Sequence, residues 1–191
     1  MNDSNRLVSS ESEELILVDS DDQEIGHLSK ALCHDGAGVL HRAFSLFLFN
    51  DKGELLLQQR AQGKRLWPGY WSNSCCSHPR RGESMQTATM RRLSDELNIE
   101  AELEHIYWFC YTAEFGEAGS ENELCHVYLG RVDGNVRPNE SEISGIRFIP
   151  IGDVTTELGN NAERYTPWLK QEWRELTDNF PDRLAKYCDP A

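Results

Sequence analysis

The side chains in this sequence that are best suited to chemistry are metal-binding ones. Glu121 and Glu123 are separated by one residue, so both carboxylates point to one face if the segment is extended. Three neutral imidazoles and two carboxylates together neutralise one divalent cation, and such mixed ligands suit Mn²⁺, Mg²⁺ or Zn²⁺. Three surface histidines beside a solvated strand end are the alternative. The candidate ligands are His34, His41, His78, Glu121 and Glu123.

A second candidate is the thiol of Cys76, in the segment Cys75-Cys76-Ser77-His78. On an extended segment Cys76 and His78 share a face, which brings the thiol close to a candidate metal ligand. A nearby cation favours the thiolate, which is the reactive form of cysteine. A buried thiol with only a packing role is the alternative interpretation.

The charge distribution indicates a third kind of site. The 191-residue chain has a formal net charge of -13, which argues against a general nucleic-acid or anionic-membrane binder. Residues 58–92, however, hold seven basic side chains and only one acid, Glu83. Such a local excess is typical of a focused anion site, although a solvated basic face has the same composition. The basic residues are Arg60, Lys64, Arg65, Arg80, Arg81, Arg91 and Arg92.

Apolar periodicity and turn signals predict the elements that position these residues. Two apolar runs flank Asn50-Asp51-Lys52-Gly53, a hairpin turn signal, whereas Trp67 to Gly82 has prolines and glycines without periodicity and predicts a structured loop. The whole pattern predicts an α+β domain with a mixed sheet, an N-terminal hairpin and C-terminal helices. Strands are expected at 14–18, 24–28, 43–49, 54–59, 106–113, 124–129 and 145–151, and helices at 84–97, 153–158 and 165–187, the last broken near Pro181.

Composition also bounds the domain organisation. Residues 1–12 are polar and acidic, and we expect a flexible N-terminus followed by one domain over residues 13–191. No apolar run approaches the roughly 20 residues that span a bilayer, and no basic-then-apolar leader is present. The six cysteines include no CxxC pair, which favours reduced thiols. We therefore expect a cytoplasmic monomer that binds neither nucleic acid nor membrane.

The segment around the predicted helix at 84–97 resembles the Nudix box, a loop-helix-loop that holds a divalent cation against a diphosphate. It departs from the box at three positions: Ser77 replaces the first Gly, Arg92 a Glu, and Asn98 the last Gly. The replaced Glu is a metal ligand in the hydrolases, so Arg92 argues against phosphoanhydride hydrolysis. An ordinary amphipathic helix with Arg91–Asp95 and Arg92–Glu96 ion pairs is the alternative. The segment reads Ser77-x5-Glu83-x7-Arg91-Arg92-Leu93-Ser94-Asp95-Glu96-Leu97-Asn98-Ile99.

Taken together, these pieces resemble the type 1 isopentenyl-diphosphate isomerases from about Glu14 to Trp168. The resemblance implies a Nudix-like fold, a mixed sheet sandwiched by helices, in an enzyme that interconverts isopentenyl and dimethylallyl diphosphate for isoprenoid biosynthesis. The motifs that carry it are Ala43-Phe44-Ser45, Trp67-Pro68-Gly69-Tyr70-Trp71-Ser72-Asn73-Ser74-Cys75-Cys76-Ser77-His78-Pro79, Glu121-Asn122-Glu123 and Pro167-Trp168.

The resemblance also implies roles for individual residues. Cys76 and Glu123 are expected to be the proton donor and acceptor on opposite faces of the isoprenoid, with Tyr111 and Trp168 beside the reacting carbons. A divalent ion (Mn²⁺, Zn²⁺ or Mg²⁺) is expected at the five His and Glu ligands, and Glu96, with the carbonyl of Cys76, is expected to hold a Mg²⁺ that also touches the diphosphate. The expected diphosphate-binding residues are Lys30, Arg60, Lys64 and Arg92.

The chemistry agrees with these roles. Shifting a double bond adds a proton at one carbon and removes one at another, through a tertiary carbocation that the π face of Trp168 stabilises by roughly 2 kcal/mol when desolvated. A free thiol has a pKa of about 8.5, so Cys76 acts as a base once partly ionised. Whether Glu123 or Tyr111 delivers the first proton stays open. The alternatives are a Nudix pyrophosphohydrolase and a non-catalytic metal- or diphosphate-binding module.

Overall fold

The structure, a computed structural model, describes residues 7–133 and 135–188. Within these ranges the strands form one nine-stranded mixed sheet around β3 (His41–Phe49). β3 runs parallel to β8 (Ser120–Arg131) and antiparallel to β6 (Cys75–Ser77). Segments that are far apart in the sequence therefore lie on either side of one strand. The sheet with its helices confirms the predicted α+β fold.

The remaining strands extend the sheet away from β3. β1 and β2 form the predicted N-terminal hairpin, β7 pairs with β8, and β4 pairs with both β5 and β9. The turn at residues 50–53 joins β3 to β4, as its Asn and Gly residues predict. These strands are β1 (Glu14–Val18), β2 (Glu24–Ser29), β4 (Glu54–Arg60), β5 (Trp71–Ser72), β7 (Leu103–Glu114) and β9 (Ile143–Pro150).

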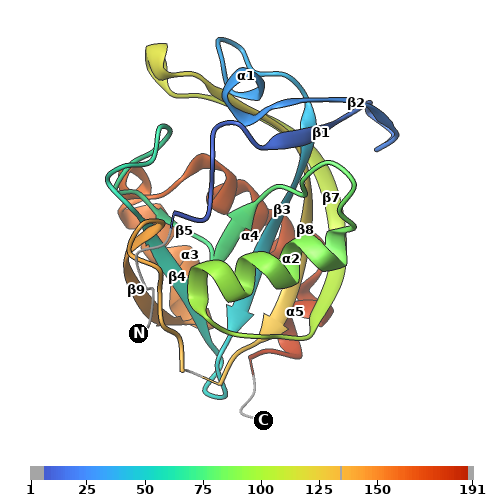
Figure 1. The fold of residues 1–191 in the computed structure, drawn as a ribbon. Coiled ribbons are helices and arrows are strands. Elements are labelled where there is room, and N and C mark those ends of the chain that lie inside the picture. Colours follow the sequence, from blue (N-terminus) through green and yellow to red (C-terminus); the bar gives the residue numbers. More distant parts are fainter. Residues whose placement is uncertain (1–6, 134, 189–191) are drawn as a thin grey trace.

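Helices cover both faces of the sheet (Figure 1). The predicted helix at 84–97 is α2, capped by the Ser84 hydroxyl, and it continues as a π-helical turn over Leu93–Leu97. Pro181 divides the predicted helix at 165–187, since it begins a new helix. The helices are α1 (Lys30–Cys33), α2 (Met85–Arg92), α3 (Ile151–Asn160), α4 (Pro167–Asn179) and α5 (Pro181–Ala185), with 3₁₀ turns at Gly116–Ala118 and Ala162–Arg164.

Side-chain alternation along β3 builds two apolar cores. Phe44, Leu46 and Leu48 point to the face that α2 covers, whereas Phe47 and Phe49 point to the face covered by α3 and α4. All five are fully buried, and each such side chain contributes roughly 1.5–3 kcal/mol relative to an exposed one. The two cores hold β3 and its neighbours in register, which fixes the side chains at the strand ends.

Two segments differ from their predicted character. The stretch 67–82, predicted as a loop, contains β5 and β6, because its backbone pairs with β4 and β3. Residues 1–6 of the predicted flexible N-terminus lie outside the described residues, but Val8 is buried and its carbonyl accepts a hydrogen bond from Arg92 at 3.0 Å. Across the described residues, no helix combines the length and apolar composition needed to cross a membrane.

Candidate active site

Three histidine side chains meet where α1, β3 and the segment after β6 approach one another. His34 Nδ1 lies 2.7 Å from the carbonyl of Lys30, and His41 Nδ1 lies 2.7 Å from the carbonyl of Val39. Because a carbonyl only accepts hydrogen bonds, both Nδ1 atoms carry the hydrogen, and in the neutral imidazoles both Nε2 atoms present a lone pair. Backbone carbonyls thus orient these two imidazoles as metal ligands are oriented.

Two carboxylates from β8 complete this cluster. The parallel register places Glu123 beside His41, and strand alternation puts Glu121 on the same face. Glu123 Oε1 lies 2.7 Å from His78 Nε2, and Glu121 Oε2 lies 2.9 Å from His34 Nε2. The structure brings all five candidate ligands together. One ligand atom from each of His34, His41, His78, Glu121 and Glu123 lies within 4.8 Å of all the others.

The five side chains fit a divalent cation. His41 is fully buried, and its Nε2 has no hydrogen-bond partner among the described residues. Glu121 Oε2 likewise makes no well-aligned hydrogen bond despite its closeness to His34. Unsatisfied buried acceptors are costly, and one ion accepting all these lone pairs removes the cost. Imidazole nitrogens and carboxylate oxygens are a donor set for a divalent ion such as Mn²⁺, Zn²⁺ or Mg²⁺.

Glu123 also contacts the aromatic side of the pocket. The Tyr111 hydroxyl donates a 2.6 Å hydrogen bond to Glu123 Oε2. Burial acts to raise the pKa of Glu123, but His41 and the Tyr111 hydrogen bond outweigh it, so the pKa is lowered. Burial and the negative charge of Glu123 raise the pKa of Tyr111. The proton shared by these two groups therefore resides on Tyr111, which is hydrogen-bonded to an ionised Glu123.

Cys76 lies on β6, on the other side of β3. Its thiol donates to Asn73 Oδ1 at 2.6 Å and lies 3.6 Å from Ser45 Oγ and 3.7 Å from Ser72 Oγ. Burial raises the pKa of Cys76 to about 12. The Cys76 thiol is therefore protonated and not partly ionised as predicted, because desolvation outweighs the nearby groups that favour the thiolate.

Trp168 closes the pocket between these two walls. The indole is almost fully buried, and its Nε1 donates to Ser72 Oγ at 3.0 Å. Its ring centroid lies 6.4 Å from that of Tyr111 and 5.2 Å from that of Trp67, edge-on to the latter. Both aromatic residues predicted for the site therefore face the same space as Cys76 and Glu123.

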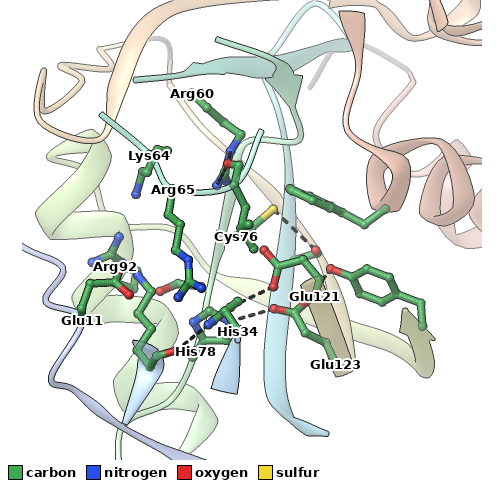
Figure 2. Close-up of a pocket in the computed structure, with 16 residues that line it drawn as sticks. Glu11, His34, Arg60, Lys64, Arg65, Cys76, His78, Arg92, Glu121 and Glu123 are labelled. Atoms are coloured by element: carbon green, nitrogen blue, oxygen red, sulfur yellow. Dashed lines mark hydrogen bonds and ion pairs between the residues drawn. The ribbon is translucent and has the colours of Figure 1, made fainter. Parts of the chain in front are cut away.

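Basic side chains gather at one end of the pocket and the His/Glu cluster at the other (Figure 2). Lys64 and Arg92 are held by the buried carboxylate of Glu142, and Lys30 donates to Ser9 Oγ at 2.6 Å. The Arg60 guanidinium lies 5.3 Å from the Trp168 ring centroid. All four predicted anion-binding residues line one pocket: Lys30, Arg60, Lys64 and Arg92.

Known proteins match the chain over most of its length. A model of the NUDIX domain matches residues 39–169. Isopentenyl-diphosphate Delta-isomerase 1 of Photorhabdus laumondii is 45% identical over 175 residues, which cover 91% of this chain and 99% of that protein. The isopentenyl-diphosphate Delta-isomerase of Serratia proteamaculans is 42% identical over 174 residues, covering 91% and 97%. The chain belongs to the isopentenyl-diphosphate Delta-isomerase family.

Solved structures share the fold of this isomerase-family chain. The protein DR0079 of Deinococcus radiodurans superposes with a TM-score of 0.70 at 23% identity, covering 85% of this chain and 98% of that one. The MutT protein of Methanosarcina mazei gives a TM-score of 0.59 at 19% identity, covering 77% and 96%. At these identities the likeness concerns the fold alone, and it agrees with the predicted Nudix-like architecture.

The structure of this isomerase-family member places one predicted ligand apart. Glu96 is buried on the π-helical turn, does not line the pocket among its described residues, and accepts from Arg92 Nε at 2.8 Å. The predicted Arg92–Glu96 ion pair is thus present, whereas Arg91 pairs with Glu83 instead of Asp95. Both hydrogen bonds from Arg92 go to Glu96 Oε1, so the guanidinium already balances the charge of this carboxylate.

The sequence analysis assigned no role to three acids in this region of the isomerase. Glu142 organises Lys64 and Arg92, Glu11 lines the pocket beside Lys30, and Glu172 is a fully buried acid of α4. Ser45, from the motif Ala43-Phe44-Ser45, touches Cys76. Glu142 lies beyond any motif, so no local signal identified it. Glu172 follows Trp168 by four residues, a spacing that places both on one face of a helix, and this was the one usable signal.

Proposed function

We propose that this chain interconverts isopentenyl and dimethylallyl diphosphate by moving a proton between two positions of the isoprenoid. The observation that carries the proposal is the placement of Cys76 and Glu123 on β6 and β8, which flank β3 and line one pocket. Neighbouring strands are about 4.8 Å apart, so β6 and β8 are roughly 9.6 Å apart across β3. Cys76 stands opposite Ser45 and Glu123 opposite His41, four residues apart along β3, and both side chains line the same pocket. Membership of the isopentenyl-diphosphate Delta-isomerase family supports the same activity.

The reaction needs one proton donor and one proton acceptor. A proton added to the terminal CH₂ of isopentenyl diphosphate forms a C–H bond and leaves a tertiary carbocation. Loss of a proton from the adjacent CH₂ then forms the new double bond. We assign these transfers to Cys76 and to the hydrogen-bonded pair of Glu123 and Tyr111, each wall serving as donor in one direction and acceptor in the other.

The pocket also protects the cation. Trp168 and Tyr111 present buried aromatic surface, which stabilises positive charge through the ring quadrupole without attacking it. Both rings are fixed, Trp168 by its hydrogen bond to Ser72 and Tyr111 by its hydrogen bond to Glu123. Their closeness leaves little space for water, which would otherwise capture the cation as an alcohol.

The basic end of the pocket suits a diphosphate. We assign diphosphate binding to the four predicted basic residues, whose guanidinium and ammonium groups form charge-assisted hydrogen bonds with phosphate oxygens. We also assign a Mg²⁺ that would accompany the diphosphate, with Glu96 and the Cys76 carbonyl as its protein ligands. A divalent ion at the His/Glu cluster supplies positive charge that holds Glu123 in place. We place the enzyme in the cytoplasm. The diphosphate-binding residues are Lys30, Arg60, Lys64 and Arg92.

Product analysis tests the function against hydrolysis. The purified protein is incubated with isopentenyl diphosphate and Mg²⁺, and phosphorus and proton NMR follow the mixture. We expect dimethylallyl signals while the diphosphate stays intact. Release of phosphate or pyrophosphate without double-bond movement would support a Nudix hydrolase instead, and binding without any turnover would support a non-catalytic module.

A further inference from the structure

Glu172 is a buried acid near the pocket that the proposed reaction does not use. It lies on α4 one turn after Trp168 and is fully buried. Its Oε1 accepts from the Cys125 thiol at 3.5 Å, and its Oε2 has no hydrogen-bond partner among the described residues. A buried carboxyl group with an unsatisfied oxygen is destabilising, so a fold that keeps one has a use for it.

The contacts of Glu172 lead to the thiol of Cys76. The sulfur of Cys125, on β8, also lies 3.4 Å from Ser45 Oγ on the central strand β3, and its single S–H donates to one of these two oxygens at a time. Ser45 is the cross-strand partner of Cys76 on β6, and its Oγ lies 3.6 Å from the Cys76 sulfur. Three adjacent strands and one helix therefore supply a continuous chain of polar contacts from Glu172 to Cys76.

The surroundings of this chain keep it neutral. Burial raises the pKa of Glu172 to about 8, and hydrogen bonds from Ser45 and Cys125 lower it only in part. The group is therefore mostly a carboxylic acid near neutral pH, which both donates and accepts hydrogen bonds. Ser45 and Cys125 are buried as well.

We propose that Glu172 is a positioning residue for Cys76, holding the thiol toward the substrate through Cys125 and Ser45. This inference rests on the proposed isomerase function. A small displacement of a reacting group lowers kcat far more than it weakens substrate binding, because the diphosphate is bound at a subsite separate from the thiol. Loss of Glu172 should therefore lower kcat while leaving KM nearly unchanged.

Five variants test the proposal through kcat, KM for isopentenyl diphosphate and Tm. Glu172→Met removes the polar contacts at similar size, and we expect kcat to fall about tenfold with KM within about twofold. Its Tm should equal or exceed that of the wild type, since the unsatisfied oxygen is gone. Glu172→Gln keeps donor and acceptor and should retain kcat within about threefold. Glu175→Met, on the same helix, is the control and should behave as the wild type.

Ser45→Ala and the double variant Ser45→Ala, Glu172→Met show whether the effect passes through Ser45. We expect the double variant to be no slower than the slower single variant, because both changes break one chain of contacts. Three results would overturn the proposal. The first is a double variant whose loss of kcat equals the product of the two single losses. The others are an unchanged kcat in Glu172→Met and a loss of kcat in Glu172→Met that is matched by a loss of Tm. If Glu172→Met does not fold, the Ser45→Ala variant decides by itself. An unchanged kcat in Ser45→Ala contradicts a role for the chain of contacts from Glu172 to Cys76. An inactive wild type would instead refute the isomerase function.

Discussion

Glu123 and Glu172 are both buried glutamates within one active-site region, yet their surroundings drive them to opposite protonation states. Glu123 faces His41 and accepts from Tyr111, and its pKa is lowered although burial opposes this. Glu172 is contacted by the Cys125 thiol, and burial, with the charge of Glu123 nearby, raises its pKa to about 8. Neighbouring groups, and not the residue type, decide the charge of a buried acid.

The same contrast divides the whole pocket. The wall with Glu121 and Glu123 holds negative charge and unsatisfied acceptors, which suit a cation. The opposite wall carries Cys76, whose buried thiol keeps its proton and is connected to Glu172 through Ser45 and Cys125. A proton-transfer enzyme needs such a difference, because one side must hold a proton while the other is ready to accept one.

Removing either reacting group should have the largest effect. We expect Cys76→Ala or Glu123→Gln to lower kcat by about 10³-fold or more, since each wall loses its proton-transfer group. Affinity for isopentenyl diphosphate, measured by calorimetry, should survive in Cys76→Ala. Cys75→Ala is the matched control, because Cys75 is buried in the core beneath α2 and does not line the pocket. An essential Cys75 with a dispensable Cys76 would reverse our assignment.

Metal removal tests the role of the His/Glu cluster separately from that of Cys76. Chelation should abolish turnover, and readdition of Mg²⁺ with Mn²⁺ or Zn²⁺ should restore it. Calorimetric Mn²⁺ affinity should fall more than tenfold in His41→Asn, which lacks an oriented ligand. His105→Asn, a histidine outside the cluster, should keep wild-type affinity. Full activity of the metal-free protein would show that the wall does not need its cation.

The basic residues at one end of the pocket should determine the affinity for the diphosphate and not the rate of proton transfer. Lys64→Gln removes one charge that lines the pocket, and we expect KM to rise about tenfold, as for one charge-assisted hydrogen bond, with kcat within about threefold. Steady-state kinetics at two salt concentrations measure both. A large fall in kcat at unchanged KM would mean that Lys64 acts on the reacting carbons.

A further prediction concerns stability and pH. The folded-state pKa of Glu172, about 8, exceeds its ordinary 4.5, so between these values the folded protein binds more proton than the unfolded chain. The resulting stabilisation is complete below pH 4.5 and is lost as pH rises to 8, by up to about 1.4 kcal/mol per pH unit.

Denaturant unfolding of wild type and Glu172→Gln across this range measures the difference. The free energy of unfolding of the wild type should decline relative to the variant, which has no titrating group at this position. A difference that does not change with pH would show that Glu172 titrates normally.

Local signals predicted the sheet and the helices, whereas the resemblance to the isomerase family supplied most of the candidate site residues. Alternation anticipated that Glu121 and Glu123 share a face, and turn residues anticipated the hairpin at residues 50–53. Sequence could not give the partners of β6, because the pairing of three residues with β3 is a tertiary effect. It also missed Glu142 and Glu172, whose importance arises from contacts with residues distant in the chain.

The central claim is tested most directly by following isopentenyl diphosphate with Mg²⁺ in deuterium oxide by proton NMR, before and after adding a chelator. The account predicts dimethylallyl diphosphate carrying deuterium in its methyl groups, with formation stopping on chelation. Unchanged substrate, or loss of phosphate without double-bond movement, would contradict it.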